Sequence, residues 1–218
     1  MIKVKLCGMN DSNIIDHCCN KEYNPDFLGF VFFNKSPRNI SYAQAKEFKQ
    51  IIGGKIPKVS VTVNSNLQSI EKIISNLEPD YLQLHGNENL EYIKEVKKEF
   101  NVKIIKAIRI KDRRDIELLA NYDDSAIDYF LFDTYTKEYG GSGLSFDWKI
   151  LDQLNTDKSW FLSGGINLNN ILLAIKSLQT RLFDISSGIE ARKGVKDIEK
   201  IDKLLNFIND YNRNHVTP

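Results

Sequence analysis

The feature that most constrains the fold of this chain is a regular alternation between short apolar runs and longer segments of helical period. The short runs are rich in β-branched and aromatic residues, as strands are, and between them apolar residues recur every three or four positions. Eight such units with no long linker favour a closed parallel barrel over an open, doubly wound sheet. The sequence therefore predicts an α/β protein, a single-domain (β/α)8 TIM barrel over residues 1–211, followed by a frayed C-terminal tail over residues 212–218.

The ends of the expected strands indicate where a site would lie. The expected strands are Ile2–Leu6, Phe27–Phe33, Lys58–Val63, Tyr81–Leu84, Lys103–Ile108, Tyr129–Asp133, Trp160–Ser163 and Phe183–Ser186. Barrel enzymes carry their chemistry at the C-terminal ends of the strands. Almost every expected strand ends in a polar residue or is followed directly by one, which a barrel used only as a scaffold would not need. We therefore expect a functional site on this face.

Charge and cysteine content narrow the class of protein. Lysines and arginines number 30 against 29 acidic residues, which argues against a nucleic-acid or membrane-surface partner because both favour a concentrated basic patch. No apolar run approaches the roughly 18–20 residues of a membrane span, and the N-terminus enters a strand pattern without a signal-peptide core. The three cysteines make a poor disulfide framework and fit no zinc spacing, so a cytoplasmic, reducing compartment is expected. Cys18 and Cys19 are expected to fill the core.

Two successive strands end in glycine-containing polar turns that are suited to holding a phosphate. The seventh strand runs into Ser163–Gly165 with a helix expected from Asn167, and the eighth runs into Ser186–Gly188 with a helix expected from Asp197. Backbone N–H groups at such turns bind anions, and barrels commonly hold phosphate after strands 7 and 8. The candidate phosphate-binding residues are Gly164, Gly165, Ser186, Ser187 and Gly188. The alternative is that the glycines only make tight turns.

Cys7, at the end of the first strand, is a candidate base or nucleophile. That role needs the thiolate, so a nearby positive charge or a helix N-terminus would have to lower the pKa of the thiol. Lys5 lies on the same side of the strand by the two-residue alternation and is the candidate for that charge. The alternative is a cysteine that packs as a small hydrophobic residue.

Asp133 closes the sixth strand after four apolar residues, a setting that suits a general acid. The alternative is an aspartate bound to backbone N–H groups of the turn. Because strands 1 and 6 lie three steps apart in an eight-strand ring, Cys7 and Asp133 are expected to face each other across the mouth, with a small substrate between them. A separated acid and base fit proton transfer on a bound sugar.

Three further features near the mouth are candidates for substrate contacts. Arg38 follows Ser36–Pro37, and its guanidinium could grip a carboxylate with two hydrogen bonds, or lie in solvent. His85 could orient the substrate or hydrogen-bond within its own loop. The glycine-rich segment Lys137–Gly143 could close over the site as a lid or act as a passive loop.

Taken in order, six segments resemble the phosphoribosylanthranilate isomerases of tryptophan biosynthesis: KVKLCGMN, GFVFFNKSPRNIS, LQLHGNE, FDTYTKEYGGSGLSFDW, LSGGIN and DISSGIEARKGVKD. The resemblance runs from the first strand to the last helix. It implies a (β/α)8 barrel without cofactor or metal, monomeric or homodimeric, whose partner is a small phosphorylated sugar–anthranilate substrate. The implied reaction is the Amadori rearrangement of N-(5-phosphoribosyl)anthranilate to the 1-deoxyribulose 5-phosphate product.

By the same resemblance Cys7 is the general base, Asp133 the general acid, and Arg38 the contact of the anthranilate carboxylate. Small departures from the family pattern occur: GGSG replaces GGTG, LSGGI replaces LAGGL, and Thr62 stands in a strand that is more usually apolar. A related sugar isomerase of histidine biosynthesis would carry an acid where Cys7 stands, and an indole-glycerol-phosphate synthase would need a catalytic lysine. The remaining alternative is a non-catalytic or differently specific phosphometabolite-binding barrel.

Overall fold

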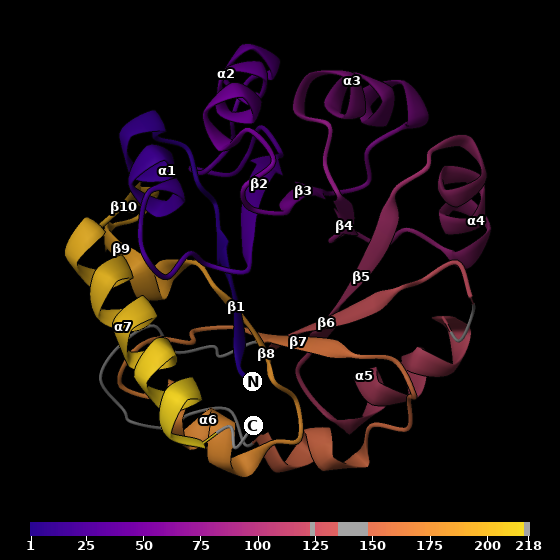
Figure 1. Cartoon of the computed structure of the whole chain (residues 1–218). Coiled ribbons are helices and arrows are strands. Elements are labelled where there is room, and N and C mark those ends of the chain that lie inside the picture. The colour runs from indigo at the N-terminus through magenta and orange to yellow at the C-terminus, as the bar shows by residue number, and fades with distance from the viewer. Residues whose placement is uncertain (123–124, 135–147, 216–218) are drawn as a thin grey trace.

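The computed structural model describes residues 1–122, 125–134 and 148–215. Eight parallel strands close into a barrel in the order β1 to β8, and the helices surround it as an outer ring (Figure 1). The predicted (β/α)8 TIM barrel is confirmed. The strands are β1 (Lys3–Cys7), β2 (Phe27–Phe32), β3 (Lys58–Thr62), β4 (Tyr81–Leu84), β5 (Lys103–Ile110), β6 (Tyr129–Thr134), β7 (Trp160–Ser163) and β8 (Leu182–Ile185).

The helices begin where the sequence supplies a capping side chain. Asp11, Ser41, Asn66 and Asn89 each accept a hydrogen bond from the first turn of the helix that follows, which satisfies an otherwise unpaired N–H group. The helices are α1 (Ser12–Cys19), α2 (Tyr42–Ile52), α3 (Leu67–Leu77), α4 (Leu90–Glu99), α5 (Arg113–Glu117), α6 (Ile171–Ser177) and α7 (Ile198–His215). The 3₁₀ helices are η1 (Leu118–Tyr122), η2 (Trp148–Gln153) and η3 (Ser187–Ile189).

Most of the hydrophobic core lies between the barrel wall and the helix ring. The outward-facing residues of the strands pack there against the apolar faces of the helices. Cys18 and Cys19 of α1 belong to this core, as predicted, and all three cysteines are free thiols. A smaller apolar cluster fills the lower interior of the barrel: Phe27, Val59, Ile105, Ala107, Leu131 and Phe161.

The interior above this cluster is polar, and this layer positions the site. Lys5, Gln83, Ser163 and Asp184 point inward from four strands, and each is at most 8 % exposed. Each of these residues lies within two positions of the C-terminal end of its strand. We call these four residues the polar floor, because the side chains at the barrel mouth stand directly above it on the same strands.

One predicted helix start differs from the structure, and one hairpin was not predicted. Helix α6 begins at Ile171 rather than Asn167, because Asn167 and Asn170 form a side-chain-bonded turn instead of a first helical turn. After β8, a two-stranded hairpin, β9 (Glu190–Arg192) and β10 (Val195–Lys196), precedes α7. Lys193 and Gly194 form the bend of this hairpin.

The C-terminal helix is longer than the sequence indicated. Helix α7 continues to His215, past the boundary expected at residue 211. Asn212, expected in the frayed tail, exchanges hydrogen bonds with the backbone N–H and carbonyl of Ile2. This end of α7 is therefore attached to the segment that enters β1.

Candidate active site

Cys7 lies at the C-terminal end of β1, inside the barrel and 7 % exposed. Val31 of β2 and Val61 of β3 pack around it, with Phe33 beside them. The backbone of β2 comes close on one side, because a Cβ built on Gly29 would lie 3.0 Å from both the Cys7 sulfur and Cε of Lys5. Any side chain at position 29 would therefore displace the thiol or the lysine.

Lys5 is fully buried and lies at the centre of the polar floor. Its Nζ donates to Oδ1 of Asp184 at 2.8 Å and to Oε1 of Gln83 at 2.8 Å, and it also hydrogen-bonds the Cys7 side chain. Ser163 completes the floor by donating from Oγ to the second carboxylate oxygen of Asp184 at 2.9 Å. The predicted proximity of Lys5 to Cys7 is thus present in the structure.

The electrostatic balance at Cys7 differs from the lowered pKa that the sequence led us to expect. Burial raises the pKa of the Cys7 thiol, and the Asp184 carboxylate adds to that effect, whereas the cations Lys5 and Lys196 oppose it. The increase wins because a thiolate loses solvation in this interior and because the Asp184 carboxylate, 2.8 Å from the Lys5 ammonium, offsets much of the charge of Lys5. Lys5 therefore limits the increase without reversing it.

Asp133 is the second-to-last residue of β6, and its side chain is 28 % exposed. His85, which follows β4, approaches it with Nε2 3.3 Å from Oδ2 of Asp133. The other ring nitrogen of His85 lies 2.8 Å from Nε2 of Gln83. His85 thus contacts side chains of β4 and β6 rather than groups of its own loop, and one of these partners is the candidate acid.

Arg38 is held by Glu190, a residue that the sequence did not single out. Nε and Nη2 of Arg38 donate to the two carboxylate oxygens of Glu190 at 2.6 and 2.8 Å, and the Glu190 side chain is 4 % exposed. The aliphatic part of Arg38 crosses the end of β1 so closely that a Cβ on Gly8 would lie 2.4 Å from its Cδ. The glycine after Cys7 is therefore needed for this crossing.

Lys196 of β10 binds the same carboxylate, at the Oε1 oxygen that also accepts from Arg38. Its buried Nζ donates to Oε1 of Glu190 and to the backbone carbonyl of Ser186, both at 3.0 Å. Burial disfavours the charge on Glu190, but Arg38 and Lys196 outweigh it and lower the pKa of that carboxyl. The hairpin thus joins the loop after β2 to the end of β8.

The two glycine turns after β7 and β8 lie against each other. A Cβ on Gly188 would lie only 2.1 Å from the carbonyl oxygen of Ile166, so packing alone requires glycine there. Gly165, by contrast, is exposed, has a φ of +73°, and a Cβ there would meet nothing within 4 Å. Ser187 is exposed in the adjacent turn, whereas the Ser186 hydroxyl donates to the backbone carbonyl of Cys7 at 3.1 Å.

Comparison with known proteins identifies the family. A family model described as N-(5'phosphoribosyl)anthranilate (PRA) isomerase matches residues 4–207. The chain belongs to this isomerase family. An N-(5'-phosphoribosyl)anthranilate isomerase of Thermoanaerobacter pseudethanolicus is 39 % identical over 206 residues, covering 94 % of this chain and 97 % of the relative.

Solved structures of the same family agree with this assignment. The phosphoribosyl anthranilate isomerase of Thermotoga maritima superposes with a TM-score of 0.82 at 31 % identity, covering 96 % of this chain and all of that one. A second structure is a complex with reduced 1-(o-carboxyphenylamino)-1-deoxyribulose 5-phosphate, with a TM-score of 0.79 at 28 % identity and coverage of 96 % and 100 %. The chain is thus an isomerase of tryptophan biosynthesis, as the sequence motifs indicated.

Five residues of this isomerase that shape the site were not among its predicted site residues: Gln83, Ser163, Asp184, Glu190 and Lys196. Alternation within the strands could have found two of them, since Gln83 lies two positions before His85 and Asp184 two before Ser186. Glu190 and Lys196 follow β8 in a hairpin whose pairing with Arg38 spans about 150 residues, and no local pattern indicates it.

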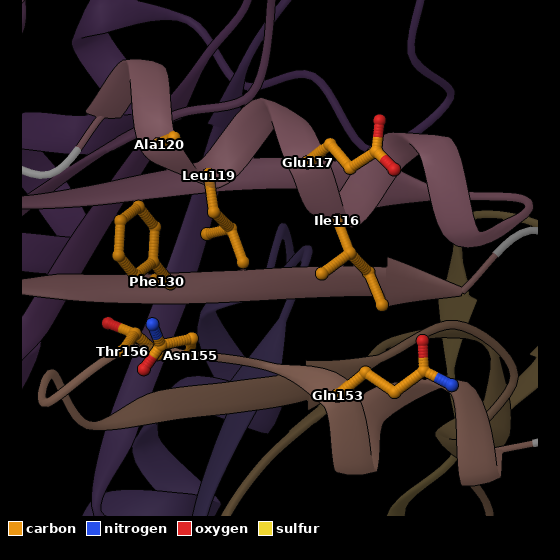
Figure 2. Close-up of a pocket in the computed structure, with 8 residues that line it drawn as sticks. All are labelled: Ile116, Glu117, Leu119, Ala120, Phe130, Gln153, Asn155 and Thr156. Atoms are coloured by element: carbon orange, nitrogen blue, oxygen red, sulfur yellow. The ribbon is translucent and has the colours of Figure 1, made fainter.

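A cavity of about 320 Å³ in this isomerase lies away from the strand ends. Figure 2 shows Ile116 and Leu119 on one side of Phe130 and the polar residues Asn155 and Thr156 on the other. Phe130 belongs to the outer core, so the cavity opens outside the barrel wall. It is therefore not part of the candidate active site.

The expected lid, Lys137–Gly143, lies outside the described residues. In the parts of the chain that the structure describes, no group of three or more His, Cys, Asp or Glu side chains is arranged to hold a metal ion. None of the helices described is long and apolar enough to cross a bilayer.

Proposed function

We propose that this isomerase catalyses the Amadori rearrangement of N-(5-phosphoribosyl)anthranilate, with Asp133 as general acid and Cys7 as general base. The observation that carries the proposal is the position of the two groups at the ends of β6 and β1, three strands apart in the closed barrel. Each is hydrogen-bonded to side chains of the interior, Asp133 to His85 and Cys7 to Lys5. Family membership over almost the whole chain supports the same assignment.

In the first step, the Asp133 carboxyl transfers its proton to the furanose ring oxygen. The bond between C1′ and the ring oxygen breaks, and its electron pair stays on that oxygen. The anthranilate nitrogen then forms a double bond to C1′, which gives a protonated Schiff base and leaves Asp133 as a carboxylate. A placed proton donor of this kind contributes roughly 10²–10⁴-fold to the rate.

In the second step, the Cys7 thiolate removes the proton from C2′. The electrons of that C–H bond form the C1′=C2′ double bond and neutralise the Schiff base, and the enolamine then tautomerises to the ketone. Because burial raises the pKa of the free thiol, the positive charge of the Schiff base is what favours the thiolate at the moment it is needed. The positive charge formed in the first step therefore promotes the proton removal in the second.

Arg38 and the two glycine turns would hold the ends of the substrate. The guanidinium, oriented by Glu190, is suited to the anthranilate carboxylate because it presents planar, charge-assisted donors. The exposed turns at Gly164, Gly165, Ser187 and Gly188 offer backbone N–H groups for the phosphate. Ser186 contributes through its fixed turn, since its hydroxyl is bound to β1.

Two substitutions test the assignment, with fluorescence of the anthranilate group as the assay for turnover. Cys7→Ser and Asp133→Asn should each lower kcat by roughly 10²-fold or more, while the reduced product analogue still binds. Cys19→Ser in the outer core and the exposed Asp157→Asn are matched controls that should keep turnover. Near-normal kcat in either site variant would contradict the assigned role, and binding without turnover in the unmodified protein would indicate a non-catalytic barrel.

A further inference from the structure

A single line of side-chain hydrogen bonds crosses the barrel from the base to the acid. Lys5 beside Cys7 donates to Oε1 of Gln83 at 2.8 Å, Nε2 of Gln83 lies 2.8 Å from Nδ1 of His85, and Nε2 of His85 lies 3.3 Å from Oδ2 of Asp133. Lys5 and Gln83 are both fully buried. The first two partners in this line are therefore fixed by the protein interior.

The direction of each hydrogen bond follows from the first one. An ammonium group can only donate, so the Gln83 atom that faces Lys5 must be the carbonyl oxygen. The Gln83 amide nitrogen, which can only donate, then faces Nδ1 of His85, so this ring nitrogen must accept. A neutral imidazole that accepts at Nδ1 carries its proton on Nε2, and this is the nitrogen that faces Asp133.

We propose that Lys5 and Gln83 are positioning residues that fix the tautomer of His85, with the proton on Nε2, so that His85 donates to Oδ2 of Asp133. The other tautomer would bring the Nδ1 proton against the amide protons of Gln83. The tautomer assignment depends only on these contacts, whereas its catalytic consequence rests on the proposed function.

The consequence concerns which oxygen of Asp133 acts as the acid. Because Oδ2 accepts from His85, the transferable proton of the neutral carboxyl lies on Oδ1. When that proton moves to the ring oxygen, negative charge develops on the carboxylate, and the Nε2 proton of His85 is already oriented to stabilise it. Donors set in advance toward developing charge lower the barrier without reorganisation.

The direct test is ¹⁵N NMR of the intact protein labelled at histidine, recorded at about pH 8, above the ordinary histidine pKa of about 6.5. The three histidines are distinguished with a His85→Asn variant. We expect the His85 ring to show a protonated Nε2 and an unprotonated Nδ1. A proton on Nδ1, or an even mixture of tautomers, would overturn the proposal, and this measurement needs no variant of the polar floor to fold.

Gln83→Glu replaces the amide group that donates to His85 with a carboxylate of almost the same shape. The new carboxylate accepts from Lys5 as before but cannot donate to His85, so Nδ1 should become protonated. Gln50→Glu on the exposed face of α2 is the matched control and should leave the His85 spectrum unchanged. An unprotonated Nδ1 in the folded Gln83→Glu protein would overturn the proposal.

Kinetics then separate positioning from simple structural support. Gln83→Glu should lower kcat about tenfold or more, a part of the 10²–10⁴-fold that a placed proton donor supplies, with KM changed less than twofold. A loss confined to KM, or no loss at all in a protein whose tautomer has switched, would refute the catalytic part. A protonated Nε2 in a protein that shows no isomerase turnover would refute the proposed function while supporting the tautomer assignment.

Discussion

Replacing Lys5 by methionine is the perturbation that most directly tests the polar floor. Lys5 and Asp184 form an ion pair of 2.8 Å with side chains 0 % and 4 % exposed. Removing one member of a buried pair leaves the other charge without compensation, which costs about 3–5 kcal/mol of unfolding free energy. For a chain of this length 1 kcal/mol corresponds to about 2–4 °C, so Tm should fall by at least roughly 6 °C.

The coupling energy between Lys5 and Asp184, measured in a double-mutant cycle, distinguishes an ion pair from two independent buried groups. Asp184→Asn keeps an acceptor for Lys5 and a partner for the Ser163 hydroxyl but removes the charge. The double variant Lys5→Met/Asp184→Asn contains no buried charge at this point, so it should be no less stable than the worse single variant, with a coupling energy of about 2–3 kcal/mol. Urea unfolding at pH 7 measures all four proteins. Losses that add in the double variant would refute the reasoning.

The single variants Lys5→Met and Asp184→Asn should shift the pKa of the Cys7 thiol in opposite directions. Lys5→Met removes a cation and should raise the pKa of the thiol further, whereas Asp184→Asn removes a carboxylate and should lower it. The pH dependence of Cys7 alkylation, resolved from Cys18 and Cys19 by peptide mass spectrometry, reports the change. Lys3→Met is the matched control, because Lys3 lies on the same strand but is exposed. An unchanged Cys7 titration in both floor variants would rule out the polar floor as its electrostatic environment.

Four further results are expected. Thr62→Val should stabilise the fold by about 1 kcal/mol in urea unfolding, because the buried Thr62 Oγ1 has no hydrogen-bond partner among the described residues; a loss of stability would contradict this. Because the pKa of Cys7 is raised above its ordinary 9.0, the rate of Cys7 alkylation should keep rising with pH up to about pH 9, and a plateau from pH 7 would contradict the raised pKa. Gly165→Ala, in open space, should raise KM more than it lowers kcat, whereas an unchanged KM would remove this turn from the phosphate site. Glu190→Gln should lower the free energy of unfolding by roughly 3 kcal/mol at pH 7 and by less at pH 4. The pKa of the Glu190 carboxyl is lowered in the folded protein, so its stabilising effect is present above the ordinary value of 4.5 and is lost as pH falls through the folded value. An equal loss of stability at both pH values would contradict this.

The strands could be predicted from the sequence because burial on both faces gives short apolar runs with clear ends. Each observed strand agrees with its predicted range to within two residues. The start of α6 could not be predicted in the same way, because Asn167 and Asn170 bond the local backbone and replace the first helical turn. The partner of Arg38 could not be predicted either, because Glu190 lies in a hairpin after β8, far from Arg38 in the sequence.

The departure at Thr62 illustrates what a sequence pattern can indicate without structure. The pattern marked this position as unusual for its strand, and the structure gives the physical reason, a hydroxyl that is buried without a partner in the part of the chain described. The pattern could not indicate which face of the strand was affected. Thr62 points outward from the barrel, whereas Val61 packs near Cys7, so the departure concerns stability and leaves the interior beside Cys7 apolar.

The two-residue repeat of the strands explains why the reacting groups and their support come from the same short segments. Lys5 precedes Cys7 on β1, Gln83 precedes His85 on β4, and Asp184 precedes Ser186 on β8, each by two positions. In a barrel this spacing stacks one inward side chain beneath the next, so each of these three mouth residues rests on a polar partner of its own strand. The partners are then joined across strands by Lys5. A substitution in the floor should therefore change the chemistry at the mouth without touching the substrate, and this is why kcat, rather than KM, is the quantity that should respond.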